Sequence, residues 1–94
     1  MEKQRFTSVW DAIEDTPQDA GNMKARSELM LAIRKVVEDW NVTQADAAAR
    51  IGVTQPRMND LLRGRIDKFS LDALITLAQS AGLKVIWQIT RVAA

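Results

Sequence analysis

Residues 43–62 read TQADAAARIGVTQPRMNDLL and contain the strongest pattern in the chain. A threonine precedes each of two short runs of helix-forming residues, at Thr43 and at Thr54, where its hydroxyl can cap the free amides of a helix N-terminus. Gly52 lies between the runs and permits the left-handed backbone that a tight turn requires. Pro56 falls in the first turn of the second run, where a missing N–H has no cost. The stretch therefore predicts two short helices joined by a tight turn.

The spacing of small and apolar residues in this stretch is that of a helix-turn-helix motif. With Gln44 as the first position, Ala48 is the small fifth residue, where the second helix crosses closely, and Gly52 is the ninth, in the turn. The four positions that such motifs bury are all apolar: Ile51, Val53, Met58 and Leu61. We interpret the pattern as a helix-turn-helix that reads a DNA major groove. A generic helical hairpin with the same burial pattern is the alternative.

Composition limits the class of protein further. A chain of 94 residues, of which 47% are apolar, suits one folded domain with a modest core. It contains no cysteine and no histidine, which excludes disulfides, thiolate nucleophiles, Cys/His metal sites and imidazole catalysis. No pairing of carboxylates suggests an acid–base mechanism. We therefore expect a binding protein rather than an enzyme, with no cofactor, no metal and no small-molecule substrate.

The sequence contains no segment that suggests a membrane or an export pathway. Its longest apolar runs are a few residues, far short of the roughly 20 that span a bilayer. The polar first residues lack the apolar centre of a secretory signal. We therefore expect a cytoplasmic protein without a membrane partner.

Charge is unevenly distributed, although the net charge is only +1. Residues 50–68 contain five basic and two acidic residues, whereas residues 1–20 contain two basic and five acidic ones. A basic middle and an acidic flank can place phosphates on one face and another partner elsewhere. Ordinary solvated charge is the alternative for segments as short as these.

A short amphipathic helix is expected near the start of the chain. Four residues at helical spacing form one apolar stripe: Phe6, Val9, Trp10 and Ile13. Because two turns of helix are unstable alone in water, the stripe must dock on the protein's own core or on a partner. The residues leave both alternatives open.

Two longer helices are expected on either side of the motif. A loop at residues 16–21 precedes the first, which runs from about Asn22 to Trp40, while Ser70 caps the second, which ends at Gly82. The first helix is expected to direct seven apolar residues inward: Met23, Leu29, Met30, Ile33, Val36, Val37 and Trp40. With the two helices of the motif and the short helix near the start of the chain, these elements predict a mostly α-helical bundle of about five helices.

The pattern changes period at the C-terminal end. From Leu83 to Thr90 the residues alternate and β-branched side chains are dense, which predicts a single β-strand. A lone strand needs a partner for its backbone groups. The same strand of a second copy, across a two-fold axis, is the simplest partner. A strand from another protein and an unpaired extended chain are the alternatives, and we expect Val85, Trp87 and Ile89 at a dimer or partner interface.

The sequence resembles the phage-repressor-like (Cro/C1, XRE) helix-turn-helix family. The resemblance is carried by TQADAAARIGVTQPRMNDLLRGR at residues 43–65 and by FSLDAL at residues 69–74. Within that family it is most similar to small HigA-type antitoxins, whose C-terminal strand resembles KVIWQI at residues 84–89. The resemblance implies a lambda-repressor-like bundle with one C-terminal strand that pairs in a dimer. The expected domains are an N-terminal segment (1–21), a DNA-binding domain (22–82) and a C-terminal strand and tail (83–94).

The resemblance also implies a function. It implies a homodimer that binds a palindromic operator in double-stranded DNA, represses its own operon and holds a RelE/HigB-like toxin, an RNase, inactive. A solitary repressor without a toxin is one alternative. A protein-interaction module that no longer binds DNA is another, favoured by two departures from the family pattern: Pro56 replaces a base-reading polar residue, and Asp60 brings negative charge to the groove.

The recognition helix expected at residues 54–63 presents one side to the groove. Gln55 lies at its N-terminal tip, the end that enters the groove in this motif, and can pair bidentately with adenine. Arg57 or Arg63 can reach guanine or a phosphate, and Asn59 can contact either a base or a phosphate. A plain solvated side chain is the alternative at each position.

Further candidates surround that helix. Pro56 offers apolar contact to a thymine methyl, and Asp60 can accept from cytosine or pair with Arg57 or Arg63. Gln44 resembles the family's phosphate clamp at a positive helix N-terminus, and basic side chains in the following loop suit phosphate contact. The candidate DNA-contacting residues are Gln44, Thr54, Gln55, Pro56, Arg57, Asn59, Asp60, Arg63, Arg65 and Lys68.

Overall fold

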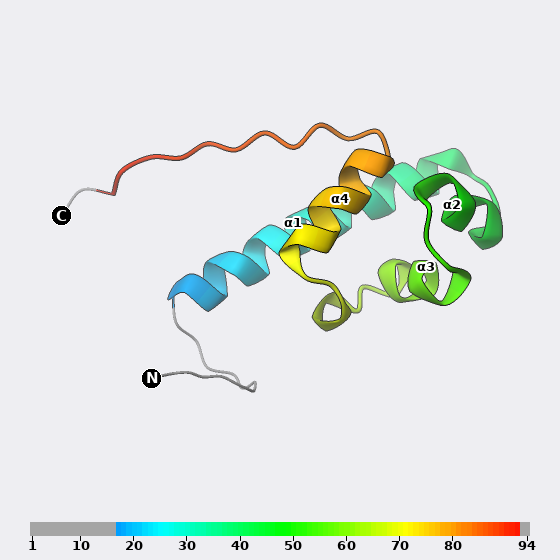
Figure 1. Cartoon of the computed structure of the whole chain (residues 1–94), viewed down its shortest axis with the longest axis horizontal. Helices are drawn as coiled ribbons and strands as arrows, with labels where there is room; N and C mark the ends of the chain where they lie inside the picture. Colours follow the sequence, from blue (N-terminus) through cyan, green and yellow to red (C-terminus); the bar gives the residue numbers. More distant parts are fainter. Residues whose placement is uncertain (1–16, 93–94) are drawn as a thin grey trace.

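The computed structural model describes residues 17–92, most of which are helical. Its elements, in chain order, are α1 (Pro17–Trp40), α2 (Gln44–Ile51), α3 (Gln55–Leu62), the short 3-10 helix η1 (Ile66–Lys68) and α4 (Leu71–Ser80). The long α1 lies against α4, and α2 and α3 lie together at one end of the molecule (Figure 1). Within residues 17–92, no helix is long and apolar enough to cross a membrane.

The mostly helical architecture confirms the main expectation from the sequence, but the five helices and the C-terminal strand are not supported. The described residues contain four α-helices, and the helix expected at Phe6–Ile13 lies outside them. Residues 83–92 are extended without forming a strand in the described part of the chain. An extended segment becomes a strand only when a second strand satisfies its N–H and C=O groups, and nothing within residues 17–92 does so.

Helix α1 begins earlier than the sequence suggests. It starts at Pro17, so the loop expected at residues 16–21 is wrong for residues 17–21. Proline is tolerated in the first turn of a helix because it lacks only an N–H that would be unpaired there. Gly21 lies inside the helix at a cost of about 1 kcal/mol relative to alanine, which a helix of this length can absorb. The expected end is confirmed, because α1 stops at Trp40 and Asn41 has a left-handed φ of 53°.

The three shorter α-helices begin directly after the residues that the sequence identifies as caps. In each case a hydroxyl oxygen accepts from the backbone N–H three residues later: Thr43 from Asp46 at 3.1 Å, Thr54 from Arg57 at 3.3 Å and Ser70 from Ala73 at 3.1 Å. Gly52 ends α2 with a φ of 88°, and its N–H donates to the carbonyl oxygen of Ala48 at 2.8 Å. These local bonds define where each helix begins and where the turn lies.

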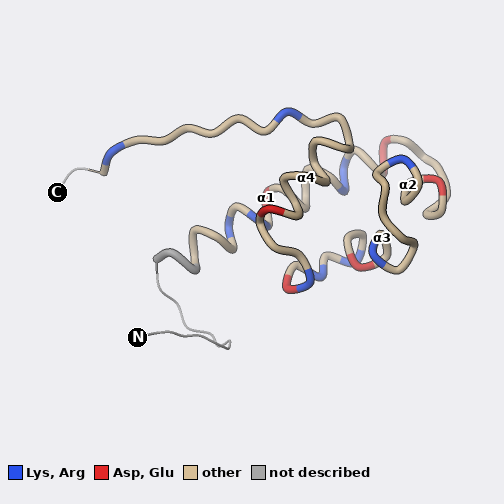
Figure 2. The backbone as a smooth tube through the Cα atoms, in the orientation of Figure 1, with Lys and Arg blue, Asp and Glu red and all other residues tan. Residues whose placement is uncertain are grey.

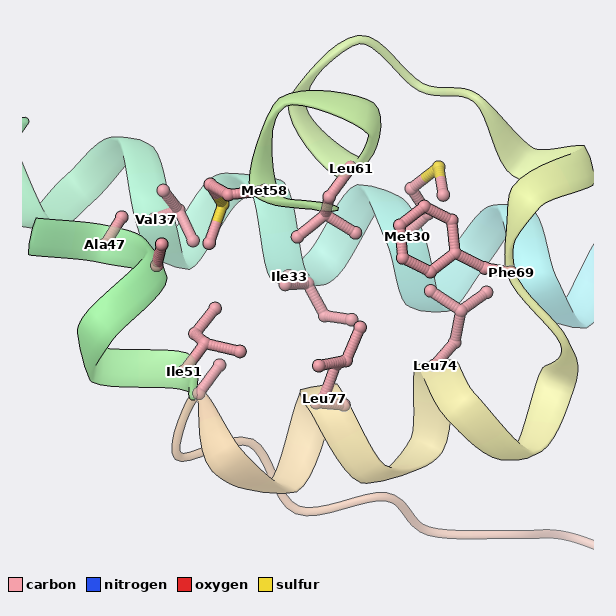
Figure 3. Close-up of a cluster of buried hydrophobic side chains, with 13 residues drawn as sticks. Met30, Ile33, Val37, Ala47, Ile51, Met58, Leu61, Phe69, Leu74 and Leu77 are labelled. Atoms are coloured by element: carbon pink, nitrogen blue, oxygen red, sulfur yellow. The ribbon is translucent and has the colours of Figure 1, made fainter. Parts of the chain in front are cut away.

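One hydrophobic core joins all four α-helices (Figure 3). Its largest fully buried side chains are Phe69, Ile33, Met58, Leu61 and Leu74. The motif positions behave as expected: Ala48, Ile51, Met58 and Leu61 are buried, and Val53 is half-buried. At about 25 cal/mol per Å² of buried apolar area, this core is the main source of the stability that holds the short helices.

Two expectations about the core need correction or refinement. Met23 is expected to face inward but is 41% exposed, because the apolar residues of α1 that pack on the core begin at Leu29. Trp40 is only half-buried and packs against the edge of the core. The guanidinium of Arg50 lies 5.0 Å from the centroid of the Trp40 ring and covers part of it.

Candidate nucleic-acid interface

Helices α2 and α3 form a rigid unit on one side of the core. The tight turn between them is built by Gly52 and by a bond from the Val53 N–H to the Ala48 carbonyl oxygen at 2.9 Å. Met58 and Leu61 fasten α3 to the core with 0% and 1% exposure. The opposite side of α3 therefore faces solvent, at the end of the molecule where α2 and α3 meet (Figure 1).

The N-terminal ends of α2 and α3 meet in an open hollow of about 340 Å³. It is lined by Gln44 from α2 and by Gln55, Pro56 and Asn59 from α3. Gln44, Gln55 and Pro56 are exposed, whereas Asn59 is half-buried. We call these four residues the reading surface. The structure thus brings together four of the ten candidate DNA-contacting residues, with three amide side chains around one apolar ring.

Arg57 does not line this hollow. Its Nη1 donates to the carbonyl oxygen of Lys68 at 2.8 Å, and its guanidinium lies 4.0 Å from the centroid of the Phe69 ring. Phe69 is 1% exposed, so Arg57 covers one face of a core aromatic side chain. Arg57 therefore ties α3 to the segment between η1 and α4.

Asp60 is paired with an arginine, although not with either of the two that the sequence suggested. Its Oδ1 lies 3.5 Å from Nη1 of Arg65, instead of meeting Arg57 or Arg63. Arg65 reaches back because its own N–H donates to the Asp60 carbonyl oxygen at 3.0 Å, which holds the two residues close. The positive charge of Arg65 therefore partly compensates the negative charge of Asp60.

The remaining candidates lie around the reading surface. Arg63 caps the C-terminal end of α3, and Lys68 ends η1; both are exposed. Figure 2 shows basic residues along the segment between α3 and α4. The exposed Thr54 uses its hydroxyl oxygen to cap α3. Basic side chains at these positions can contact phosphates on either side of a groove.

Arg26 is a supporting residue that sequence reasoning missed. From α1, its Nη1 donates to the carbonyl oxygens of Ile66 at 3.4 Å and Phe69 at 3.2 Å. These bonds fix the η1 loop that carries Arg65 and Lys68. The partners are some forty residues apart in the chain, so no local sequence pattern reveals the contact.

Two of the predicted interface residues of the C-terminal segment, Val85 and Trp87, line a hollow beside α1. Val85 is half-buried, whereas Trp87 and Ile89 are 56% and 92% exposed. A hollow of about 230 Å³ separates residues 85–87 from α1, where Leu29 forms part of its lining. The other predicted interface residues, Phe6, Val9, Trp10 and Ile13, lie outside the described residues. In the described part of the chain, no cluster of acidic residues could hold a metal ion.

Comparison with known proteins agrees with this geometry. A family model described as a helix-turn-helix domain matches residues 12–90. A comparison with curated proteins finds no match. The matching solved structures include one named as an XRE family transcriptional regulator, with 31% sequence identity and a TM-score of 0.72. That match covers 81% of this chain and 91% of the other. The chain therefore belongs to the helix-turn-helix domain family and, within it, to the XRE family of DNA-binding transcriptional regulators.

Proposed function

We propose that this protein is an autoregulating antitoxin: a repressor that binds a palindromic operator as a homodimer and neutralises a RelE/HigB-like toxin. The observation that carries the DNA-binding part is the reading surface. Gln55 lies at the N-terminal tip of a capped, solvent-facing α3, which is the end that enters a major groove in this motif, and Asn59 follows one turn later on the same helix. Gln44 joins them from the start of α2. Amide side chains there suit base edges, because each offers both a donor and an acceptor.

The surroundings of the reading surface support phosphate anchoring. Arg63, Arg65 and Lys68 are exposed in the segment that follows α3. The N-terminus of α2, next to Gln44, adds the partial positive charge of a helix end. Such contacts fix the register of a protein on the duplex, while the bases determine which sequence is preferred.

A protein-interaction module that has lost DNA binding is less well supported. The charge of Asp60, which would repel phosphates, is partly compensated by Arg65. Pro56 lies among three amides, where its ring can contact a thymine methyl. Neither departure from the family pattern therefore removes the capacity to read a groove.

The homodimer is proposed from the C-terminal segment. Residues 84–92 form no backbone hydrogen bond with other described residues, and they carry exposed apolar side chains, among them Ile86, Trp87 and Ile89. Pairing of this segment with its copy across a two-fold axis would satisfy its backbone groups and cover the side chains. Two recognition helices about 34 Å apart would then meet successive major grooves of a palindromic operator.

The antitoxin role rests on the resemblance to HigA-type proteins, and its test is separate from that of DNA binding. The product of a small neighbouring reading frame would be expressed with and without this protein. If this protein is the antitoxin, its expression restores growth, and the two proteins copurify as a complex. If no neighbouring product is toxic, the solitary repressor is the better description.

The test of DNA binding is a gel shift with the DNA upstream of the protein's own gene, titrated with salt. Scrambled DNA of equal length is the control. We expect preferential binding to the upstream DNA, with an affinity that falls steeply as salt rises, because phosphate contacts release counterions. Equal binding of both duplexes at low salt would contradict the proposed function.

A further inference from the structure

The reading surface has an unusual chemical composition for a DNA-contacting site. Its four residues are three amides and one proline, and none of them is basic. Arginine and lysine are the side chains that most often identify guanine, because they donate twice to its O6 and N7. The surface that faces the groove therefore lacks the usual guanine reader.

The amides of this surface fit adenine rather than guanine. Adenine presents one acceptor, N7, and one donor, the N6 amino group, which match the amide NH₂ and carbonyl oxygen of Gln55 or Asn59. Guanine presents two acceptors there, so an amide that donates to both leaves its own carbonyl oxygen without a donor from that base. Thymine, the partner of adenine, adds a methyl group that can pack on the Pro56 ring.

The arginine closest to the tip of α3 is held elsewhere. To reach a guanine, Arg57 would have to break its bond to the Lys68 carbonyl oxygen and leave the Phe69 ring. Leaving would expose a ring face that is now buried, at a cost in apolar surface and in cation–π energy. Arg57 is therefore a positioning residue for the η1 loop.

The two other arginines near α3 are also poorly placed to read a base. Arg65 is engaged with Asp60. Arg63 lies at the C-terminal end of α3, whereas base edges are contacted from the N-terminal end in this motif. Both positions suit contact with phosphates.

We propose that the protein reads each half-site chiefly through A·T base pairs, with adenine held by Gln55 and Asn59 and a thymine methyl packed on Pro56. This inference rests on the proposed DNA binding and assigns the kind of base pair that the site selects. Among the described residues, none that lines the reading surface is basic, which disfavours guanine at the contacted positions.

The test begins with selection from a pool of duplexes whose central sequence is random, using the full chain. We expect the enriched sequences to carry A·T pairs at the positions protected by α3. The best duplex is then synthesised with 7-deazaadenine at those positions, which removes N7. Affinity should fall about 2- to 10-fold for each hydrogen bond lost. Replacing guanines with 7-deazaguanine should leave the affinity unchanged.

Two variants test whether the loss of affinity caused by 7-deazaadenine arises from Gln55. In Gln55→Ala, 7-deazaadenine at the position contacted by residue 55 should no longer change the affinity, because the N7 contact is already gone. Gln79→Ala is the matched control, since Gln79 is an exposed amide on α4, outside the reading surface. It should respond to 7-deazaadenine as the unmodified protein does.

The outcomes separate this inference from the function on which it rests. Enrichment of G·C pairs at the protected positions, with sensitivity to 7-deazaguanine, would overturn the A·T assignment and leave sequence-specific DNA binding intact. If no sequence is enriched at all, both the assignment and the proposed function are wrong.

Discussion

At the scale of single residues, Arg57 shows how a partner outside the helix changes a side chain's role. On a helical projection it flanks the side of α3 that faces the groove, so the sequence suggests contact with guanine or phosphate. In the structure it lies on Phe69 and bonds to the carbonyl oxygen of Lys68. Eleven residues separate Arg57 from Lys68, and no helical periodicity extends that far across a turn. Its role therefore follows from tertiary packing.

Replacing Arg57 with alanine should destabilise the fold by about 1–2 kcal/mol, because the Phe69 ring loses its cover and a charged hydrogen bond is lost. The free energy of unfolding would be measured in urea. Arg63→Ala is the matched control, since Arg63 is exposed at the end of α3. Its effect should stay within about 0.5 kcal/mol. Equal effects of the two substitutions would contradict the stabilising contacts assigned to Arg57 with Lys68 and Phe69.

At the scale of elements, prediction from sequence succeeds where the determining contacts are local. The caps at Thr43, Thr54 and Ser70 each bond three residues away, and Gly52 bonds to Ala48 within the same helix end. Their residue types alone carry the information. The proximity of Gln55, Pro56 and Asn59 could be predicted for the same reason, since all three lie on α3 within about one turn of its start. The support of the η1 loop by Arg26 could not be predicted from the sequence, because this contact joins α1 to a loop some forty residues away.

The turn between α2 and α3 provides a test at this scale. Gly52 has a φ of 88°, and a Cβ added there would meet nothing within 4 Å. Gly52→Ala should therefore cost about 1 kcal/mol or more, from backbone strain alone. Gly21→Ala is the matched control: Gly21 lies inside α1, also with open space around it, and alanine should stabilise that helix by about 0.5–1 kcal/mol.

Thermal unfolding of both glycine variants, followed by circular dichroism, would measure these effects. The expected result is a lower midpoint for Gly52→Ala and a higher one for Gly21→Ala. A higher midpoint for both would show that the turn does not require the left-handed backbone.

At the scale of the whole molecule, the C-terminal segment depends on a pairing partner for the structure that its sequence predicts. The alternation from Leu83 to Thr90 is typical of a strand, and the segment is indeed extended (Figure 1), but a strand requires a neighbour that residues 17–92 do not supply. The strand prediction is therefore not supported within the described residues. Its exposed Trp87 and Ile89 are the side chains that the proposed dimer would cover.

If the segment pairs with a second copy, a double substitution of Trp87 and Ile89 with aspartate should give monomers in analytical ultracentrifugation. Charge on the apolar faces would oppose close pairing. The matched control is Leu31→Asp, on α1, where the leucine is 59% exposed and lies outside the C-terminal segment. The control should remain dimeric. Monomers of the unmodified protein, at concentrations that bind operator DNA, would contradict the dimer.

The central claim is that α3 reads DNA through the reading surface. The most direct measurement is the affinity of Gln55→Ala for the upstream operator, by fluorescence anisotropy, beside Gln79→Ala and with both folds verified by circular dichroism. We predict that Gln55→Ala loses about 1–3 kcal/mol of operator binding, while Gln79→Ala and the affinity for scrambled DNA do not change. If Gln55→Ala binds the operator with unchanged affinity and preference, α3 does not read the groove as described.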